Sequence, residues 1–340
     1  MKAFIFFVAI CSAIIFGCSK TGLQLKNKSH DAGSIFPPGF TDSLLLILPE
    51  SDDFAAIPQD PRNPLTKEKV ELGKLLFHET KLGGNPKMAK GLYTFSCASC
   101  HHAEAGFQSA IVQAIGEGGE GFGIRGEGRV PSTAYMQESV DVSPLHSPSV
   151  MNTAYQEVLL WNGSMGSSGV NTKTQYAWTG PLLAANFLGY QGLETVAIAG
   201  LQKHRFYVDS AWLYSNAIYQ NLFYLSFPEL PEDKRITTIT TALAMAAYER
   251  TVLASQAPFQ KYLNGDNAAM SANQKAGAKL FFGKAKCSNC HQGPALSSMS
   301  FYALGINDMQ NGVHGAINIF NNAAENKGRG GFTGRDQDMY

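Results

Sequence analysis

Two short segments of the chain combine a helix-start signal with apolar residues at helical spacing. In the first, Thr66 is suited to be the N-cap of a helix that reaches Phe77, and Leu65 and Val70 are placed to form a hydrophobic staple. The second, residues 271–282, begins with a Ser-x-x-Gln capping box and has similar apolar spacing. Because both segments carry Leu-Phe near their ends, the pattern predicts two short helices of one kind.

A third and longer helix is predicted at residues 235–254. Apolar side chains recur there at intervals that place them on one face of a helix. They are Ile236, Ile239, Leu243, Ala246, Ala247 and Leu253. We expect this helix to open a second domain.

The middle of the chain has no strong periodicity. Between residues 115 and 190, glycines cluster at 116–128 and again at 163–169. Long irregular segments of this kind usually wrap or gate a site. The sequence therefore predicts a mainly α fold with long glycine-rich loops.

The N-terminus has the pattern of an export signal. Residues 1–17 contain one basic residue, Lys2, and then an apolar run that is too short for a membrane-spanning helix. Residues 15–18 resemble the lipobox of bacterial lipoproteins, although Phe16 stands where a small residue is usual. We expect cleavage before Cys18 and lipidation of its thiol, which would anchor the protein to a membrane in the periplasm. The alternative is an ordinary secretory signal with a chance cysteine, and both interpretations take the protein out of the cytoplasm.

A linker is expected between this signal and the folded body, over residues 18–60. The stretch is polar at first and then rich in proline, as is typical of an extended connection. The apolar residues 44–48 interrupt it, and we expect them to pack on the folded body.

Composition limits the function classes. The chain has 340 residues, enough for two domains, and its 27 basic and 27 acidic residues give no formal net charge, which excludes nucleic acid as an expected partner. Of the six cysteines, Cys11 and Cys18 lie in the first twenty residues, and the other four form two C-x-x-C-H motifs. No cysteine is left for a structural disulfide.

The two motifs, residues 97–101 and 287–291, predict two covalently attached c-type haems. Two thiols at this spacing can bridge both vinyl groups of a haem from one helical turn, and the next residue is a histidine that can reach the iron. The attachment residues are Cys97, Cys100 and His101 for the first haem, and Cys287, Cys290 and His291 for the second. Zinc is the alternative, but it needs four ligands gathered at one site, and an immediately adjacent histidine is poor zinc geometry.

Each motif follows one of the two similar helices, so the sequence contains a duplicated cytochrome c-like unit. The first copy has a longer insertion, residues 83–94, between helix and cysteines. We predict an N-terminal domain over residues 61–232 and a C-terminal domain over residues 233–340.

These features resemble the di-haem cytochrome c peroxidase family, which includes the methylamine-utilisation di-haem enzymes. The resemblance extends over residues 57–340. The matching pieces are residues 63–66, 72–77, 97–101 with 106–107, 147–152, 160–163, 180–183, 248–251, 258–266 and 287–291. It implies a first haem that reacts with peroxide, a second haem that accepts electrons from a small donor, and a tryptophan between them, to which Trp161 corresponds.

The chain departs from the family where peroxide protons are handled. The family's glutamine and glutamate correspond here to Ala177 and Phe187. Glu194 lies nearby, and Glu117 stands near the place of a distal histidine in many members. Both are candidate catalytic acids, although such residues are more often solvated or structural.

Two further departures concern calcium and the end of the chain. The family's calcium-binding asparagine corresponds to His146, and calcium prefers oxygen ligands, so a calcium site is doubtful. In the family, the distal ligand of the second haem and the last helices come well after the second motif. We therefore expect the C-terminal domain to be incomplete in this chain.

Three functions remain open. The leading hypothesis is a lipid-anchored periplasmic peroxidase that reduces hydrogen peroxide to water with electrons from a small cytochrome or copper protein. The second is an oxidase of the methylamine-utilisation type, which would explain the missing glutamine and glutamate. The third is a non-catalytic electron-transfer or redox-sensing cytochrome, in which both axial positions of each haem would be filled.

Overall fold

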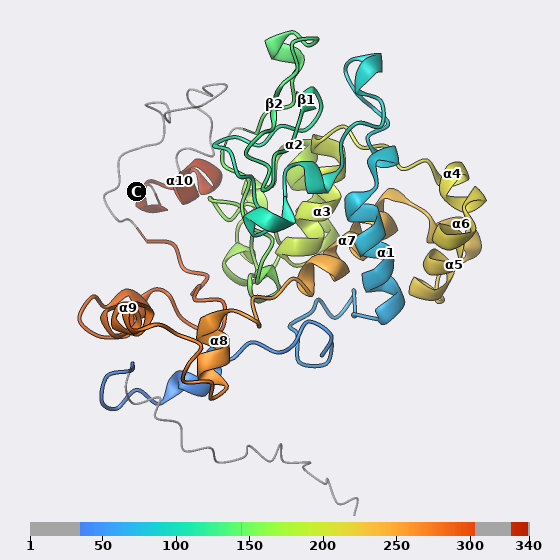
Figure 1. Ribbon diagram of the computed structural model, residues 1–340. Helices are drawn as coiled ribbons and strands as arrows, with labels where there is room; N and C mark the ends of the chain where they lie inside the picture. The colour runs from blue at the N-terminus through green and yellow to red at the C-terminus, as the bar shows by residue number, and fades with distance from the viewer. Residues whose placement is uncertain (1–34, 144, 303–327, 339–340) are drawn as a thin grey trace, which may run out of the picture. The chain divides into compact units, whose positions relative to one another are not determined.

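The computed structural model describes residues 35–143, 145–302 and 328–338 (Figure 1), and these residues form a mainly helical fold, as predicted. The predicted signal peptide and the lipidation site at Cys18 lie outside the described residues. Within the described part of the chain, no helix is long and apolar enough to cross a bilayer.

The helices are separated by single 3-10 turns and irregular loops. In the described residues one antiparallel pair of strands, β1 Gly119–Glu120 and β2 Val130–Pro131, begins in the first glycine cluster, ends just after it, and pairs Gly119 with Pro131. The helices are α1 Lys67–His78, α2 Gly180–Leu183, α3 Gly192–Lys203, α4 Ser210–Ser215, α5 Ala217–Ser226, α6 Glu232–Arg235, α7 Thr238–Arg250, α8 Pro258–Leu263, α9 Ala272–Phe282 and α10 Gly328–Thr333.

Both predicted helix starts are confirmed. The Thr66 side chain accepts a hydrogen bond from the backbone N–H of Lys69 at 3.2 Å, and Leu65 packs in one apolar cluster with Val70. In the second copy, the backbone N–H of Ser271 donates to Gln274 Oε1 at 2.7 Å, and the serine hydroxyl accepts from the Gln274 N–H at 3.3 Å. These side chains satisfy N–H groups that have no partner within the helix.

The close crossing of α1 and α7 forms the main core. Leu72 and Leu76 of α1 are fully buried against Leu243 and Ala244 of α7. A Cβ atom added to Gly73 would lie 1.8 Å from the carbonyl oxygen of Ala244. Only glycine allows the two backbones to approach so closely.

Helix α7 is shorter than predicted and belongs with different neighbours. It packs against α1 and α3, which lie beside it in Figure 1. The boundary that we predicted between residues 232 and 233 therefore separates α7 from the helices that it packs against. Leu253 lies beyond the end of α7, and Ile239 is 40% exposed, so the predicted apolar face is correct only in its central part.

Residues 35–48 are not part of a slack linker, which corrects the prediction for residues 18–60. Phe36 and Leu46 are buried in a cluster with Tyr262 and Phe282. Gln260 of α8 holds the segment by accepting from the Leu48 N–H and donating to the Leu46 carbonyl, each at 2.9 Å. Within the predicted apolar run 44–48, Leu46 and Leu48 are buried as expected, whereas Leu44 and Leu45 remain exposed.

The duplicated helices differ at the position of Gly73. Its counterpart in α9 is Gly277, because each glycine stands four residues before the phenylalanine of the shared Leu-Phe pair. A Cβ atom at Gly277 would have no neighbour within 4 Å among the residues that the structure describes. The two glycines therefore form a matched pair for measuring the importance of the crossing.

We predict that Gly73→Ala lowers the free energy of unfolding by about 2 kcal/mol or more, because the added methyl group forces α1 and α7 apart. Gly277→Ala should be neutral or stabilise by up to about 1 kcal/mol, because alanine favours helix and nothing opposes its methyl group. Denaturant unfolding of both variants beside the wild type measures the difference. Equal effects would contradict the assigned role of Gly73.

Candidate functional site

The first haem motif forms a single 3-10 turn, Cys97–Ser99, in which Cys97 accepts two backbone hydrogen bonds. Its carbonyl oxygen accepts from the N–H of Cys100 at 3.1 Å and from that of His101 at 3.0 Å. The Ser99 hydroxyl accepts from the Ser96 N–H at 3.1 Å and fixes the start of the turn. Two thiols and an imidazole are thus held on one turn, as covalent haem attachment requires.

The second motif repeats this geometry. The turn spans Cys287–Asn289, and the Cys287 carbonyl accepts from Cys290 at 3.1 Å and from His291 at 2.9 Å. The four cysteines of the motifs carry free thiols. The second motif is more open than the first, because the His291 side chain is exposed, whereas His101 is half-buried.

Both motif histidines are oriented by a backbone carbonyl. His101 Nδ1 lies 3.1 Å from the Phe107 oxygen, and His291 Nδ1 lies 3.0 Å from the Leu296 oxygen. A carbonyl only accepts, so Nδ1 carries the proton and Nε2 keeps the lone pair that an iron requires. Phe107 and Leu296 share a left-handed backbone, with φ of 55° and 52°.

A phenylalanine from the preceding helix lies behind each histidine. The ring centroid of Phe77 in α1 is 6.4 Å from that of His101, and the centroid of Phe281 in α9 is 5.9 Å from that of His291. The phenylalanine of each Leu-Phe pair therefore packs its ring against the haem-binding turn that follows it.

Burial keeps the groups of the first motif uncharged. Desolvation lowers the pKa of His101 to about 4, so its imidazole is neutral at neutral pH and can coordinate a metal. It also raises the pKa of Cys97 and that of Cys100, the latter to about 12. Neutral imidazole beside two unpaired thiols is a donor set that fits a c-type haem.

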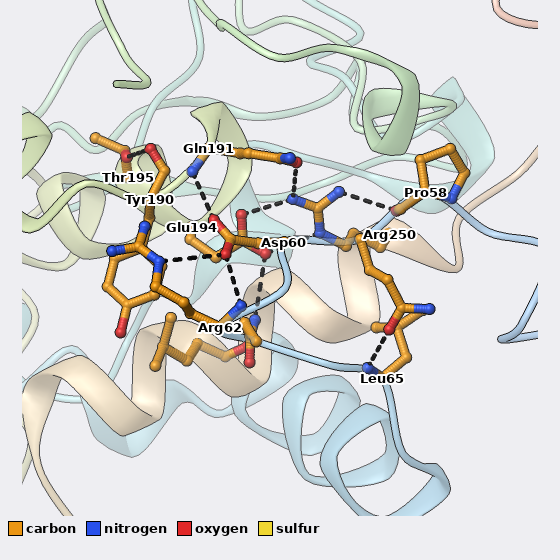
Figure 2. A network of polar contacts seen from close by, with 12 residues as sticks. Pro58, Asp60, Arg62, Leu65, Tyr190, Gln191, Glu194, Thr195 and Arg250 are labelled. Atoms are coloured by element: carbon orange, nitrogen blue, oxygen red, sulfur yellow. Dashed lines mark hydrogen bonds and ion pairs between the residues drawn. The ribbon is translucent and has the colours of Figure 1, made fainter. Parts of the chain in front are cut away.

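Glu194 lies in a fully buried ion pair, shown in Figure 2. Its Oε1 accepts from Arg250 Nε at 2.8 Å and its Oε2 accepts from Arg250 Nη2 at 2.6 Å, while Asn63 Nδ2 donates to Oε1 at 3.2 Å. Arg250 also donates to the Pro58 carbonyl and to Gln191, both at 3.0 Å. The network joins residues 58–63 to α3 and α7, which is a structural function. A catalytic role for Glu194 stays a prediction.

Glu117 is also fully buried and engaged. Its carboxylate accepts from the backbone N–H groups of Lys87 at 2.8 Å and Met88 at 3.0 Å, and it forms an ion pair with Arg205. These three donors fix the carboxylate inside the protein. A catalytic role for Glu117 likewise stays a prediction.

Trp161 lies in the loop before the second glycine cluster, and it is 62% exposed. Arg329, in α10, donates to the carbonyl of Asn162 at 3.3 Å and to that of Gly163 at 3.1 Å, and so holds this loop.

Ala177 and Phe187 stand where the family has its glutamine and glutamate, and neither can transfer a proton. Phe187 is 63% exposed and contacts Trp178 edge-on at 5.1 Å.

Sequence reasoning missed three charged residues beside the first motif. Asp141 and Arg129 both lie close enough to Cys100 to influence its thiol electrostatically, and Asp141 is paired with His204 at 3.3 Å. Glu249 approaches Cys97, and its burial near Glu194 raises its pKa to about 8. No local motif marks these residues, because each reaches the site from a distant segment or from an irregular loop.

The fold and the two histidine-bearing turns define a class, the mainly helical c-type cytochromes with two haem-attachment sites in one chain. Within this class, the chain belongs to the di-haem cytochrome c peroxidase family, whose model matches residues 67–268. The matched residues include the first haem motif and its surrounding helices. This result confirms the resemblance seen in the sequence, and membership implies haem c as the cofactor.

Named relatives include both branches of the family. Cytochrome-c peroxidase IdrP1 of Pseudomonas sp. strain SCT is 32% identical over 74% of this chain and 53% of its own. Methylamine utilization protein MauG of Methylorubrum extorquens is 28% identical over 76% and 59%. Cytochrome c551 peroxidase of Pseudomonas aeruginosa is 26% identical over 72% and 56%. The chain thus spans about half the length of these relatives.

Among solved structures, a MauG-like protein associated with microbial copper homeostasis has a similar fold. Its TM-score is 0.52 at 24% identity, and the match covers 86% of this chain and 71% of the other. This likeness supports the mainly helical fold.

We predict that Glu194→Gln lowers the free energy of unfolding by about 3 kcal/mol, because it leaves the Arg250 guanidinium buried without a countercharge. Glu71→Gln on the exposed side of α1 is the control, since it removes the same charge at the surface and should change stability by no more than about 0.5 kcal/mol. Denaturant unfolding measures both. A Glu194 variant as stable as the control would show that the ion pair is dispensable.

We also predict that the purified protein keeps two haems through acid-acetone extraction, because thioether bonds survive when axial bonds break. Replacing Cys97 and Cys100 with alanine should remove one haem, and replacing Cys287 and Cys290 should remove the other. The pyridine haemochrome spectrum counts the haems that remain. Release of all haem from the wild type would refute covalent attachment.

Proposed function

We propose that this protein is a periplasmic di-haem peroxidase that reduces hydrogen peroxide to water with electrons from a small cytochrome or copper protein. The observation that carries the proposal is the pair of matching turns, each with a histidine whose Nδ1 is fixed by a carbonyl. Two one-electron centres in one chain match the two electrons that each peroxide takes up. Relatives that bear the name cytochrome c peroxidase support this choice.

The first motif is the proposed site of peroxide reduction. A haem bound there would be held by Cys97, Cys100 and His101 and would supply an iron that can bind peroxide. Glu117 stands near the family's distal histidine position, but its carboxylate is fixed by Lys87, Met88 and Arg205. A carboxylate held by three donors is not free to bind an iron, so we do not expect Glu117 to block peroxide there.

A second candidate is an oxidase of the methylamine-utilisation type. The observation that favours it is the apolar character of Ala177 and Phe187, where the peroxidases keep a proton-transfer pair. Cleavage of the peroxide O–O bond needs a group that moves a proton and stabilises the departing hydroxide. Without such a pair, we expect steady-state reduction of peroxide to water to be slow. Oxidation of an organic or protein substrate is then the second candidate reaction.

We further propose that the protein is exported and held at a membrane by a lipid on Cys18. The support for this is the apolar run of residues 3–16 and the lipobox-like residues 15–18. Fractionation of cells that express Cys18→Ala tests it. Release of the variant into the soluble periplasmic fraction is expected, and unchanged membrane association would contradict the lipid anchor.

The peroxidase proposal predicts a high-spin first haem in the oxidised protein as isolated, without prior reduction, because Glu117 is held by other donors and is not expected to bind the iron. Hydrogen peroxide should then be consumed in the steady state with a reduced cytochrome as donor. Optical and electron paramagnetic resonance spectra measure the spin state, and donor oxidation measures turnover.

Two results would contradict this proposal. A purely low-spin protein that does not react with peroxide would favour the electron-transfer function. Rapid reaction with one equivalent of peroxide, followed by no turnover with any small reduced donor, would favour the oxidase.

A further inference from the structure

Arg129 is a buried cation beside the first haem motif, and its hydrogen-bond partners are neutral. Its side chain is 4% exposed. Nε donates to the Ile115 carbonyl at 2.5 Å, and Nη2 donates to the Gly116 carbonyl at 2.7 Å. The guanidinium also covers the ring of Phe122 at 4.8 Å from its centroid.

Among the described residues, no carboxylate oxygen lies within ion-pair distance of Arg129. Two other arginines each have a carboxylate partner, because Arg250 is paired with Glu194 and Arg205 with Glu117. A buried charge is costly unless an opposite charge compensates it. Carbonyl oxygens and an aromatic ring supply only part of that compensation.

Packing within the hairpin fixes the position of the Arg129 guanidinium. Residue 129 directly precedes β2, and its guanidinium lies over β1, where a Cβ atom at Gly119 would come within 2.7 Å of Arg129 Nε. Glycine at position 119 therefore makes room for the side chain. The hairpin in turn packs beside the motif, against His102, the residue that follows it. The ring centroids of Phe122 and His102 are 6.2 Å apart, and Gly126 approaches the same histidine.

This placement brings the cation to the site where a haem is attached. Arg129 and Cys100 are close enough to interact electrostatically. Asp141 also faces Cys100, but its carboxylate accepts from His204 at 3.3 Å. A c-type haem carries two propionate carboxylates, which are the anions that this site would gain on haem attachment.

We propose that Arg129 is the countercharge of a propionate group of the first haem. The inference rests on haem attachment at residues 97–101 and does not depend on peroxidase activity. A fixed positive charge beside the haem would also disfavour the ferric form of the iron relative to the ferrous form, which carries one positive charge less. Arg129 should therefore raise the reduction potential of the first haem and leave that of the second unchanged.

Potentiometric titration of the two-haem protein, followed optically, tests the proposal. Arg129→Gln should shift the equilibrium of the first haem toward the ferric form by about tenfold, a fall of about 59 mV for one electron. The first haem is identified as the one absent from the protein in which Cys97 and Cys100 are replaced by alanine. The second haem is an internal reference.

Arg125→Gln is the matched control, because Arg125 is in the same hairpin and carries the same charge but is exposed. Its potentials should equal those of the wild type. Arg129→Lys keeps the charge and should keep the first potential within about threefold of the wild-type equilibrium. This variant decides the matter if the glutamine variant does not fold.

Three results would overturn the proposal. The first is an unchanged potential of the first haem in Arg129→Gln with both haems present. The second is an equal shift in Arg125→Gln. The third is a fall in Arg129→Lys as large as that expected for the glutamine variant. Each is measured without peroxide, so a protein that lacks peroxidase turnover can still confirm or refute the role of Arg129.

Discussion

The crossing of α1 and α7 at Gly73 is the contact on which the first haem site depends. It brings the Ala244 carbonyl against a position where any larger side chain would collide. The same crossing places Tyr248 against Phe77, at 5.5 Å between ring centroids, and Phe77 in turn lies behind His101. Two residues after Tyr248, α7 presents Arg250 to Glu194 and so joins α3 to the pair. Backbone approach, aromatic packing and a buried ion pair thus act together to position one imidazole.

The second haem turn shows which parts of this arrangement are local. It repeats the 3-10 turn, the phenylalanine behind the histidine, and the carbonyl that fixes Nδ1, although no helix of the described residues crosses α9 closely at Gly277. The haem-binding turn is therefore determined by residues near it in the chain. The surroundings of each haem are determined by long-range packing, which is where the two sites differ and where their chemistry can diverge.

This division explains what could be predicted from the sequence. The Thr66 cap and the capping box at Ser271 were predicted correctly, and the two haem motifs form matching turns, because each feature depends on neighbouring residues. The neighbours of α7 were not predicted, since helical periodicity identifies an apolar face but not the element that covers it. The ion pairs of Glu194 and Glu117 were not predicted, because their partners, Arg250 and Arg205, lie far along the chain. Arg129 was missed because a glycine-rich loop gives no periodic signal.

The proposed peroxidase activity requires that peroxide react at the first haem and that the second electron come from the other haem. Anaerobic titration of the fully reduced protein with hydrogen peroxide tests this most directly. The account predicts that one peroxide per protein oxidises both haems, with a sharp end point in the optical spectrum. Haems that stay reduced after one equivalent, or that oxidise only slowly in excess peroxide, would contradict it.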